Sequence, residues 1–332
     1  MAIKGGCQTY PKTDYQPHET PIAPSIRMKT IRSQPVLPAD FDHIRRISGF
    51  ERIQSEYPAY LSDESKLTAG RIEELFFPTN EGELAAILRE MASRKINVTI
   101  AGARTGLVGG CVPQHGALVS LENFDRVRAL GYDAGACEWH ISCQCALSLR
   151  NLNAQVAAKQ FPDLRQCGDL ATQGALEEFT RQSDEYLYAP DPTEMSASIG
   201  GTVATNASGA RTYRSGPTRD WVRALRVMLP SGEVLAIERD EFRAASGGEF
   251  QLEDSRGRIQ TIQLPTYRMP PTKNTAGFYS AAQIDLIDLF IGSEGSFGII
   301  TQVTVALIKR TEKISVVLFL DSDRQAIELV KA

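Results

Sequence analysis

Glycine is concentrated in a segment that is suited to binding a phosphate group. Residues 101–110, here called the first glycine tract, contain four glycines in ten positions. Glycine lets successive backbone N–H groups turn toward one point and lets a ligand approach without meeting a Cβ, which forms a nest for a diphosphate. A tight surface loop is the alternative interpretation of this segment taken alone.

Two further segments have a related composition. Residues 189–209, the second glycine tract, are small, polar and almost free of charge, with Gly200 and Gly201 for close backbone approach and Asn206 as an uncharged hydrogen-bonding group. Residues 289–300, the third glycine tract, lead into an alternating strand. The first and second tracts lie far apart in the sequence, so we predict one long ligand held by both.

Two common nucleotide-binding fingerprints are absent from these tracts. Neither the dinucleotide pattern G-x-G-x-x-G nor the phosphate-loop pattern G-x-x-x-x-G-K-S/T occurs in them. Their absence disfavours an ordinary Rossmann enzyme and a phosphate-loop ATPase.

A group of cysteines with a histidine, at residues 137–145, offers thiolate and imidazole ligands for a metal ion. In a strand alternate residues share one face, so Cys137, Trp139 and Ile141 are expected to face inward and His140 to face the opposite side. Buried core thiols are therefore favoured, with a metal site as the alternative, and the prediction for the chain is no metal.

Candidates for acid–base catalysis are scarce, because the chain has four histidines. His115 follows the first glycine tract and is expected to be an exposed turn residue rather than a catalytic base. Arg211 and Arg214 follow the second tract and either bind an anion or face solvent. Lys273 is a candidate contact to a negatively charged ligand edge or a substrate carboxylate. The catalytic residues are therefore unassigned from the sequence.

The composition is that of a folded, water-soluble chain. Hydrophobic residues make up 42% and charged residues 23% of 332 residues, a length that allows about two domains. The net charge of -4 and the lack of a polybasic run argue against nucleic-acid binding. The longest apolar stretch is too short to cross a bilayer, and the N-terminus lacks a signal-peptide core. The six cysteines are expected to be reduced thiols, and the predicted compartment is the cytoplasm.

The chain is expected to begin with a segment that does not pack into the core. Proline and polar residues dominate residues 1–40, a composition that buries too little apolar surface to order itself, so we predict a flexible arm. A helix is predicted over residues 41–57, within a helical lead-in that spans residues 41–71.

The next elements position the first glycine tract. Strands are predicted at residues 75–78 and 96–100, joined by a helix that Asn80 and Glu83 cap and in which apolar residues recur at helical spacing. The first tract then leaves the carboxyl end of the second strand. A further strand is predicted at residues 117–121.

The second half of the sequence is expected to be mostly β-structure. A hairpin is predicted for residues 221–238, around Pro230 and Gly232. Residues 239–258 are polar and are expected to be a surface insertion. Near the end, residues 314–320 are predicted to be a strand, and residues 321–323 supply N-cap candidates for a final helix. A lone strand and helix have no layer to pack against, so a second domain is expected to have just begun there.

The ordered set of motifs resembles the FAD-binding domain (PCMH type) of the vanillyl-alcohol oxidase and p-cresol methylhydroxylase superfamily. The likeness is strongest to its D-lactate, glycolate and D-2-hydroxyglutarate dehydrogenase branch, and it covers about residues 72–310. The motifs that carry it are residues 77–79, 101–110, 190–192, 199–202, 206–209 with Arg211 and Arg214, 273–277, 291–295 and 298–300.

This resemblance implies an α+β fold in which two α/β subdomains hold an extended FAD between them. The implied domains are an arm at residues 1–40, the lead-in at 41–71, the FAD-binding domain at 72–312, and at 313–332 only the first strand and helix of a cap domain. The first tract would hold the diphosphate through backbone N–H groups, and the second would line the isoalloxazine and ribityl groups. The implied cofactor contacts are Pro78, Ala101, Gly102, Ala103, Arg104, Thr105, Gly106, Leu107, Pro190, Asp191, Ser198, Gly200, Gly201, Thr202, Asn206, Gly209, Gly298 and Ile300.

The resemblance also implies an activity. Some members of the superfamily link the flavin covalently through a histidine in the first loop, and residues 104–107 contain none, so we predict dissociable FAD. The implied reaction is oxidation of a 2-hydroxy acid of the D-lactate or glycolate type by hydride transfer to flavin N5. A separate acceptor, a protein or a quinone, would reoxidise the flavin.

Substrate recognition is expected to lie outside this sequence, because the cap domain of this branch supplies most substrate contacts. A partner chain that carries a cap is therefore one expectation. The alternative is a non-catalytic flavin-binding subunit or fragment of a larger redox complex. A UDP-sugar or cell-wall reductase of the same superfamily is disfavoured by the motif around Lys273.

Overall fold

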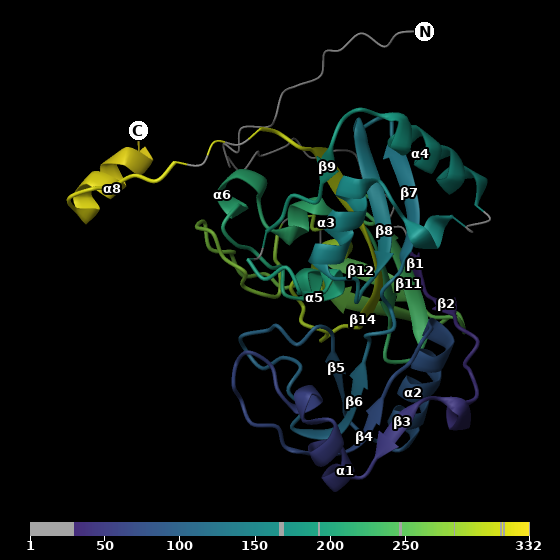
Figure 1. Cartoon of the computed structure of the whole chain (residues 1–332). Coiled ribbons are helices and arrows are strands. Elements are labelled where there is room, and N and C mark those ends of the chain that lie inside the picture. The colour runs from purple at the N-terminus through teal and green to yellow at the C-terminus, as the bar shows by residue number, and fades with distance from the viewer. Residues whose placement is uncertain are drawn as a thin grey trace.

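Two lobes make up the body of the molecule, and each is built on its own main sheet (Figure 1). The computed structural model describes residues 30–165, 169–191, 193–245, 248–281, 283–312, 314 and 316–331. The elements of the lower lobe are β3 (Arg46–Ser48), α1 (Phe50–Glu56), β4 (Arg71–Phe76), α2 (Glu81–Ser93), β5 (Val98–Ala101) and β6 (His115–Ser120). Its sheet has the order β3-β4-β6-β5, in which β4, β6 and β5 are parallel and β3 is antiparallel.

Helix α2 begins as its sequence predicts. The Asn80 side chain accepts a hydrogen bond from the Glu83 N–H at 3.0 Å, and the Glu83 carboxylate accepts one from the Thr79 N–H at 2.8 Å. These bonds satisfy N–H groups that the first helical turn leaves without partners. Leu84 and Met91 are among the residues on the face that α2 buries, so the predicted strand–helix–strand unit is confirmed.

The upper lobe contains a larger sheet with the order β2-β11-β10-β14-β8-β7, and β9 adds to β14 outside this path. The strands are β2 (Gln34–Pro35), β7 (Val127–Asp133), β8 (Glu138–Gln144), β9 (Tyr186–Leu187), β10 (Val222–Met228), β11 (Glu233–Glu238) and β14 (Ile299–Lys309). The helices are α3 (Leu149–Ala158), α4 (Leu170–Arg181), α5 (Ile199–Ala204), α6 (Thr212–Ser215) and α7 (Ile287–Phe290). Strands β10 and β11 form the predicted hairpin, and no helix among the described residues combines the length and apolarity that a membrane crossing requires.

One hydrophobic core joins the two lobes. Side chains of α2, such as Leu84, pack in the same cluster as Phe76 of the lower sheet and Trp139 and Val303 of the upper sheet. A smaller cluster that includes Ile53 of α1 covers the other face of the lower sheet. Burial of this apolar surface holds the lobes against each other and so fixes the space between them.

The N-terminal expectations need correction. Residues 1–29 of the predicted arm lie outside the described residues, but β1 (Ile31–Arg32) pairs with β12 (Glu249–Glu253), and β2 pairs with β11. The single helix predicted over residues 41–57 is wrong, because β3 separates a 3-10 turn, η1 (Phe41–His43), from α1. The physical reason is local, since Gly49 adopts φ +93° and sends the chain from a strand into a helix.

The polar segment 239–258 is more than the predicted surface insertion. Strands β12 and β13 (Ile259–Gln263) form a three-stranded sheet with β1, and Phe250 is buried beneath it. Alternation of apolar residues within β12 turns Phe250 inward while the charged residues face out. The segment therefore adds a small layer to the upper lobe.

The C-terminal expectation is partly wrong. The described residues in 314–320 form no strand, and their side chains are exposed. A strand needs a partner for its backbone N–H and C=O groups, and the described part of the chain provides none there. Helix α8 (Asp323–Lys331) does form, and the Ser322 Oγ accepts a hydrogen bond from the Gln325 N–H. That this segment begins a cap domain stays a prediction.

The cysteine group of β8 follows the predicted alternation with one exception. Trp139, Ile141, Cys143 and Cys145 are buried, so the inward face is confirmed for them. Cys137 is exposed, because it sits in the turn before β8 with φ +55° rather than in the strand.

Glu138, at the start of β8, links strands across the upper sheet. Its carboxylate accepts hydrogen bonds from Arg223 of β10 at 2.6 Å and from the His140 ring at 2.8 Å. Burial by itself raises the pKa of Glu138, but the hydrogen bonds from His140 and Arg223 outweigh it and lower the pKa from 4.5 to about 2. The carboxylate is thus stabilised in its charged form.

This shift predicts a pH-dependent contribution to stability. A carboxyl whose pKa is lower in the folded state stabilises the fold fully above its unfolded pKa and loses that effect as the pH falls toward the folded pKa. Glu138→Gln should therefore be less stable than the wild type above pH 4.5, and the difference should vanish as the pH approaches 2. Urea midpoints of both proteins across this range measure the effect, and a difference that does not change with pH would contradict it.

Candidate functional site

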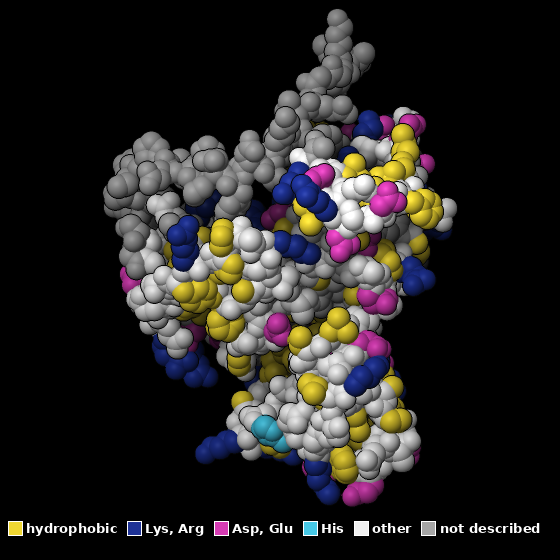
Figure 2. Space-filling model, turned by 90° about the vertical axis from the view of Figure 1, so that its left-hand side faces the viewer, with side chains coloured by type: hydrophobic (Ala, Val, Ile, Leu, Met, Phe, Trp, Pro, Cys, Tyr) yellow, Lys and Arg dark blue, Asp and Glu magenta, His cyan; other side chains and the backbone are white. Residues whose placement is uncertain are grey.

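A cavity of about 490 Å³ lies between the two lobes, and all three glycine tracts contribute to its wall. Figure 2 shows the waist between the lobes with hydrophobic side chains in it. Pockets that take a cofactor-sized ligand have this order of volume. The predicted contacts that line it are Gly102, Ala103, Arg104, Thr105, Gly106, Leu107, Ser198, Gly200, Gly201, Thr202, Gly298 and Ile300.

The first glycine tract lines this cavity with backbone whose N–H groups are largely without protein acceptors. Ala101 ends β5, and its carbonyl accepts a hydrogen bond from the Leu121 N–H, which ties the start of the tract to the sheet. Beyond it, the N–H groups of residues 102–107 have no protein acceptor in the described part of the chain. Residues 102–106 are half-buried, so these donors need a ligand or water. A run of such donors fits a diphosphate.

Ser198 is the point where the first and second tracts meet. Its Oγ caps α5 by accepting a hydrogen bond from the Gly201 N–H at 3.3 Å. A Cβ built on Gly102 or on Gly201 would lie 2.8 Å from this oxygen, closer than real Cβ atoms come. Glycine at both positions therefore avoids a clash with Ser198 and leaves space in the cavity for a ligand.

Gly200 has a different reason to lack a side chain. Its N–H donates to the Cys145 carbonyl at 2.8 Å, and a Cβ would lie 2.9 Å from the same oxygen. The residue therefore lets α5 pack directly on the end of β8.

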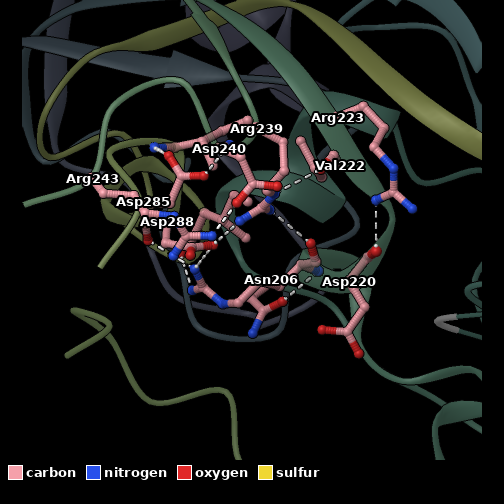
Figure 3. A network of polar contacts seen from close by, with 12 residues as sticks. Asn206, Asp220, Val222, Arg223, Arg239, Asp240, Arg243, Asp285 and Asp288 are labelled. Carbon is pink, nitrogen blue, oxygen red and sulfur yellow. Dashed lines mark hydrogen bonds and ion pairs between the residues drawn. The ribbon is translucent and has the colours of Figure 1, made fainter. Parts of the chain in front are cut away.

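The third tract is docked on α5 by backbone hydrogen bonds. The Gly292 N–H donates to the Val203 carbonyl at 3.0 Å, and the Glu294 N–H donates to the Ala204 carbonyl at 2.8 Å. A buried network of ion pairs next to the third tract stabilises its position (Figure 3). In it the Asp288 carboxylate receives Arg219 and Arg239, each at 2.8 Å.

Arg219 extends this network to both neighbouring tracts. Its guanidinium donates to the Ile291 carbonyl at 2.5 Å, and its backbone N–H donates to the Asn206 side chain at 3.0 Å. Asn206 therefore joins the second tract to the third from a buried position.

Six of the predicted cofactor contacts lie outside the cavity wall, and several of them have partners within the protein. Asp191 forms an ion pair with Arg211 at 3.2 Å, and the Gly209 N–H donates to the Thr212 hydroxyl at 2.7 Å. The Pro78 carbonyl accepts a hydrogen bond from Asn123. The six are Pro78, Ala101, Pro190, Asp191, Asn206 and Gly209, while Pro192 of the same motif lies outside the described residues.

The predicted cationic contacts are not in the wall either. Arg211 is paired with Asp191, and Arg214 donates to the Thr311 hydroxyl at 3.3 Å. Lys273 is exposed, although Thr275 of the same segment lines the cavity. Their contact with a ligand or substrate stays a prediction.

Sequence reasoning missed several polar residues of the wall, namely Asp63, Cys111, Glu194 and Glu294. Asp63 lies in the predicted helical lead-in, but it accepts a hydrogen bond from the Ser65 N–H at 2.9 Å in a turn. An Asp-x-Ser turn is a loop signal that the sequence offered. Glu294 lies within the third glycine tract, and no separate sequence signal marked it as a residue of the cavity wall.

Cys111 lies beside Asp63, with its Sγ 3.8 Å from the Asp63 carboxylate. Burial, together with the negative charge of Asp63, raises the pKa of Cys111 to about 11. Thiols react as thiolates, so this cysteine is held in an unreactive form at neutral pH.

These surroundings predict an order of thiol alkylation. Among the four cysteines that the structure describes, exposed Cys137 should react with iodoacetamide first at pH 8, Cys111 far more slowly, and buried Cys143 and Cys145 only after unfolding. Peptide mass spectrometry at timed intervals measures the order. Labelling of Cys143 as fast as that of Cys137 in the folded protein would contradict it.

The fold and this site define a flavin-binding protein. Residues 73–175 and 166–238 match the family model described as FAD binding domain, so the chain belongs to this family and FAD is its cofactor. The site fits the group, because it offers unpaired N–H donors for a diphosphate and a floor of glycines. The resemblance to the PCMH-type domain is thereby confirmed.

Several oxidoreductases are similar in sequence to this chain. A D-lactate dehydrogenase of Anaerostipes hadrus is 34% identical over 72% of this chain and 37% of its own length. A D-lactate dehydrogenase of Archaeoglobus fulgidus is 27% identical over 78% and 44%, and the glycolate oxidase subunit GlcD of Bacillus subtilis is 27% identical over 71% and 37%. The chain therefore spans less than half the length of these relatives.

A solved structure has the same fold. The 6-hydroxy-D-nicotine oxidase of Arthrobacter nicotinovorans superposes with a TM-score of 0.50 at 11% sequence identity, over 80% of this chain and 42% of that one. The predicted mixed α and β fold of a PCMH-type FAD-binding domain is confirmed.

Proposed function

We propose that this chain is the FAD-binding part of an oxidoreductase that converts a small 2-hydroxy acid, of the D-lactate or glycolate type, to a 2-oxo acid. The main support is the first glycine tract. The N–H groups of residues 102–107 have no acceptor among the described residues, which favours an anionic ligand in the cavity. The names of the relatives, two D-lactate dehydrogenases and a glycolate oxidase subunit, favour this substrate class.

When bound, FAD supplies the redox chemistry by taking the α-hydrogen of the acid as a hydride at N5. The residues of this chain bind and orient the cofactor. The first tract would hold the diphosphate, and Gly102 and Gly201 leave room above Ser198. The hydroxyl proton would pass to a base, and a separate acceptor, a protein or a quinone, would take the two electrons.

Binding of FAD is proposed to be non-covalent. Residues 104–107 contain no histidine, and Cys111 in the same wall is held as a thiol by its raised pKa. Acid precipitation of the FAD-loaded chain should therefore leave the absorbance near ~450 nm in the supernatant. Colour that stays in the pellet would contradict the proposal.

Activity is tested by anaerobic addition of D-lactate or glycolate to the FAD-loaded protein. Bleaching of the flavin band supports the enzyme, and L-lactate serves as the control for stereochemistry. A spectrum that stays oxidised favours the alternative, a flavin-binding subunit of a larger redox complex.

A further inference from the structure

A tyrosine outside the matched family segment supports one charged side chain in the cavity wall. Tyr60 lies in the 3-10 turn η2 (Pro58–Leu61), before residue 73, where the family match begins. The Arg104 guanidinium lies over the Tyr60 ring, with its carbon 4.3 Å from the ring centroid. Stacking on an aromatic face orients a guanidinium while leaving its N–H donors available at the edge.

The Tyr60 ring is itself held in place. Its hydroxyl donates to the Glu122 carboxylate at 2.7 Å, and the Ser120 hydroxyl donates to the same oxygen at 3.0 Å. Burial and the neighbouring Glu122 raise the pKa of Tyr60 to about 12, so the phenol keeps its proton at neutral pH. The chain Ser120–Glu122–Tyr60 therefore fixes the platform on which Arg104 rests.

Arg104 has the features of a residue that awaits an anion. It adopts φ +58°, a conformation that costs a side-chain-bearing residue energy, and it is half-buried in the cavity wall. Its contacts within the described residues are the Tyr60 ring and a long hydrogen bond to the Gly102 carbonyl at 3.5 Å, and none of them is an ion pair. Its N–H donors therefore remain available to an anionic ligand in the cavity.

We propose that Arg104, positioned by Tyr60, binds the diphosphate of FAD together with the N–H groups of residues 102–107. The inference rests on the proposed function, because it assigns a partner to the FAD of that site. A guanidinium adds a full charge and forked donors to the partial charges of the nest, and phosphate oxygens match that fork. Tyr60 is a positioning residue, since it acts through Arg104.

The affinities for three ligands distinguish a contact with the diphosphate from a contact with the flavin. FAD carries both a diphosphate and a flavin, riboflavin carries the flavin only, and ADP carries the diphosphate only. Arg104→Asn removes the charge and tolerates the positive φ, because asparagine is favoured there. It should weaken FAD and ADP about tenfold or more, measured by calorimetry, and leave riboflavin within about twofold.

Variants of Tyr60 test the platform. Tyr60→Phe keeps the ring and should retain FAD affinity within a few-fold, whereas Tyr60→Leu removes the ring and should reproduce most of the Arg104→Asn loss. Arg46 provides a matched control, because its guanidinium carbon lies 5.0 Å from the Phe41 ring centroid but outside the cavity wall. Arg46→Asn should leave all three affinities unchanged.

The other possible outcomes each contradict at least one of the two proposals. Equal losses of FAD and riboflavin affinity, no loss with Arg104→Asn, or an equal loss with Arg46→Asn would overturn the role of Arg104. A wild-type chain that binds ADP but not FAD would overturn the proposed function, while the ADP affinities of the variants would still decide the role of Arg104. A chain that binds neither ligand would overturn both.

Discussion

Gly102→Leu is expected to abolish FAD binding in a chain that still folds. Gly102 begins the nest after β5, and even a Cβ at this position would lie 2.8 Å from the Ser198 Oγ. Because Gly102 lines the cavity of about 490 Å³, a leucine side chain there takes space that the ligand would occupy. Its Cβ also displaces the Ser198 hydroxyl that caps α5, so the substitution should lower the free energy of unfolding by about 1 kcal/mol, the usual cost of a lost cap.

The measurement is FAD affinity together with thermal unfolding of the same samples. We expect Kd to rise about 100-fold or more with a small change in Tm. Gly131→Leu is the matched control, because Gly131 of β7 has no atom within 4 Å of its Cβ position and lies outside the cavity wall. Near-normal FAD affinity in Gly102→Leu would mean that the cofactor does not lie over the first glycine tract.

Among these variants, Asp288→Ala is expected to cause the largest decrease in the free energy of unfolding. The Asp288 carboxylate accepts from both Arg219 and Arg239 at 2.8 Å, and its side chain is 11% exposed. Removing it takes the paired carboxylate away from two largely buried guanidinium groups, whose remaining acidic neighbours are Asp220 and Asp285. Breaking a buried ion pair costs about 3–5 kcal/mol. The third tract should also loosen, because Arg219 holds the Ile291 carbonyl.

Urea unfolding measures this loss, and FAD affinity reports the loosening of the tract. Asp288→Asn keeps the shape but not the charge and should lie between the wild type and Asp288→Ala. The control is Glu185→Ala, which breaks the 2.9 Å ion pair with Arg310 on the surface and should cost less than about 0.5 kcal/mol. If both alanine variants lose the same stability, the network is not what holds the tract.

The two experiments divide the site into parts with different physical roles. Gly102 is needed for the ligand and hardly for the fold, while Asp288 is needed for the fold and acts on the ligand only through the third tract. A protein in which both variants lost binding and stability together would have a site that folds only around its cofactor.

Local sequence was sufficient wherever the structure depends on neighbours in the chain. The capping of α2 by Asn80 and Glu83 needs residues three apart, and the β10–β11 hairpin needs a turn at Gly232. The inward face of β8 follows from alternation. The glycines of the first tract likewise indicated a nest without any knowledge of the fold.

Other features depended on partners that lie far away in the sequence. Strand β3 forms because it pairs with β4. Strand β12 pairs with β1, which lies more than two hundred residues earlier. The apolar residues at 314–320 had the composition of a strand but found no partner in the described part of the chain. Strand pairing is a long-range interaction, so composition alone does not decide it.

The site shows the same division. The sequence by itself determined which backbone can receive a ligand, because a high content of glycine is a local property of the three tracts. Only the tertiary structure decided which side chains face that backbone, since folding of the lower lobe brings Tyr60 to Arg104 and Asp63 to Cys111, and Glu122 after β6 to Tyr60. Their roles depend on distance and burial, which arise when these segments pack together.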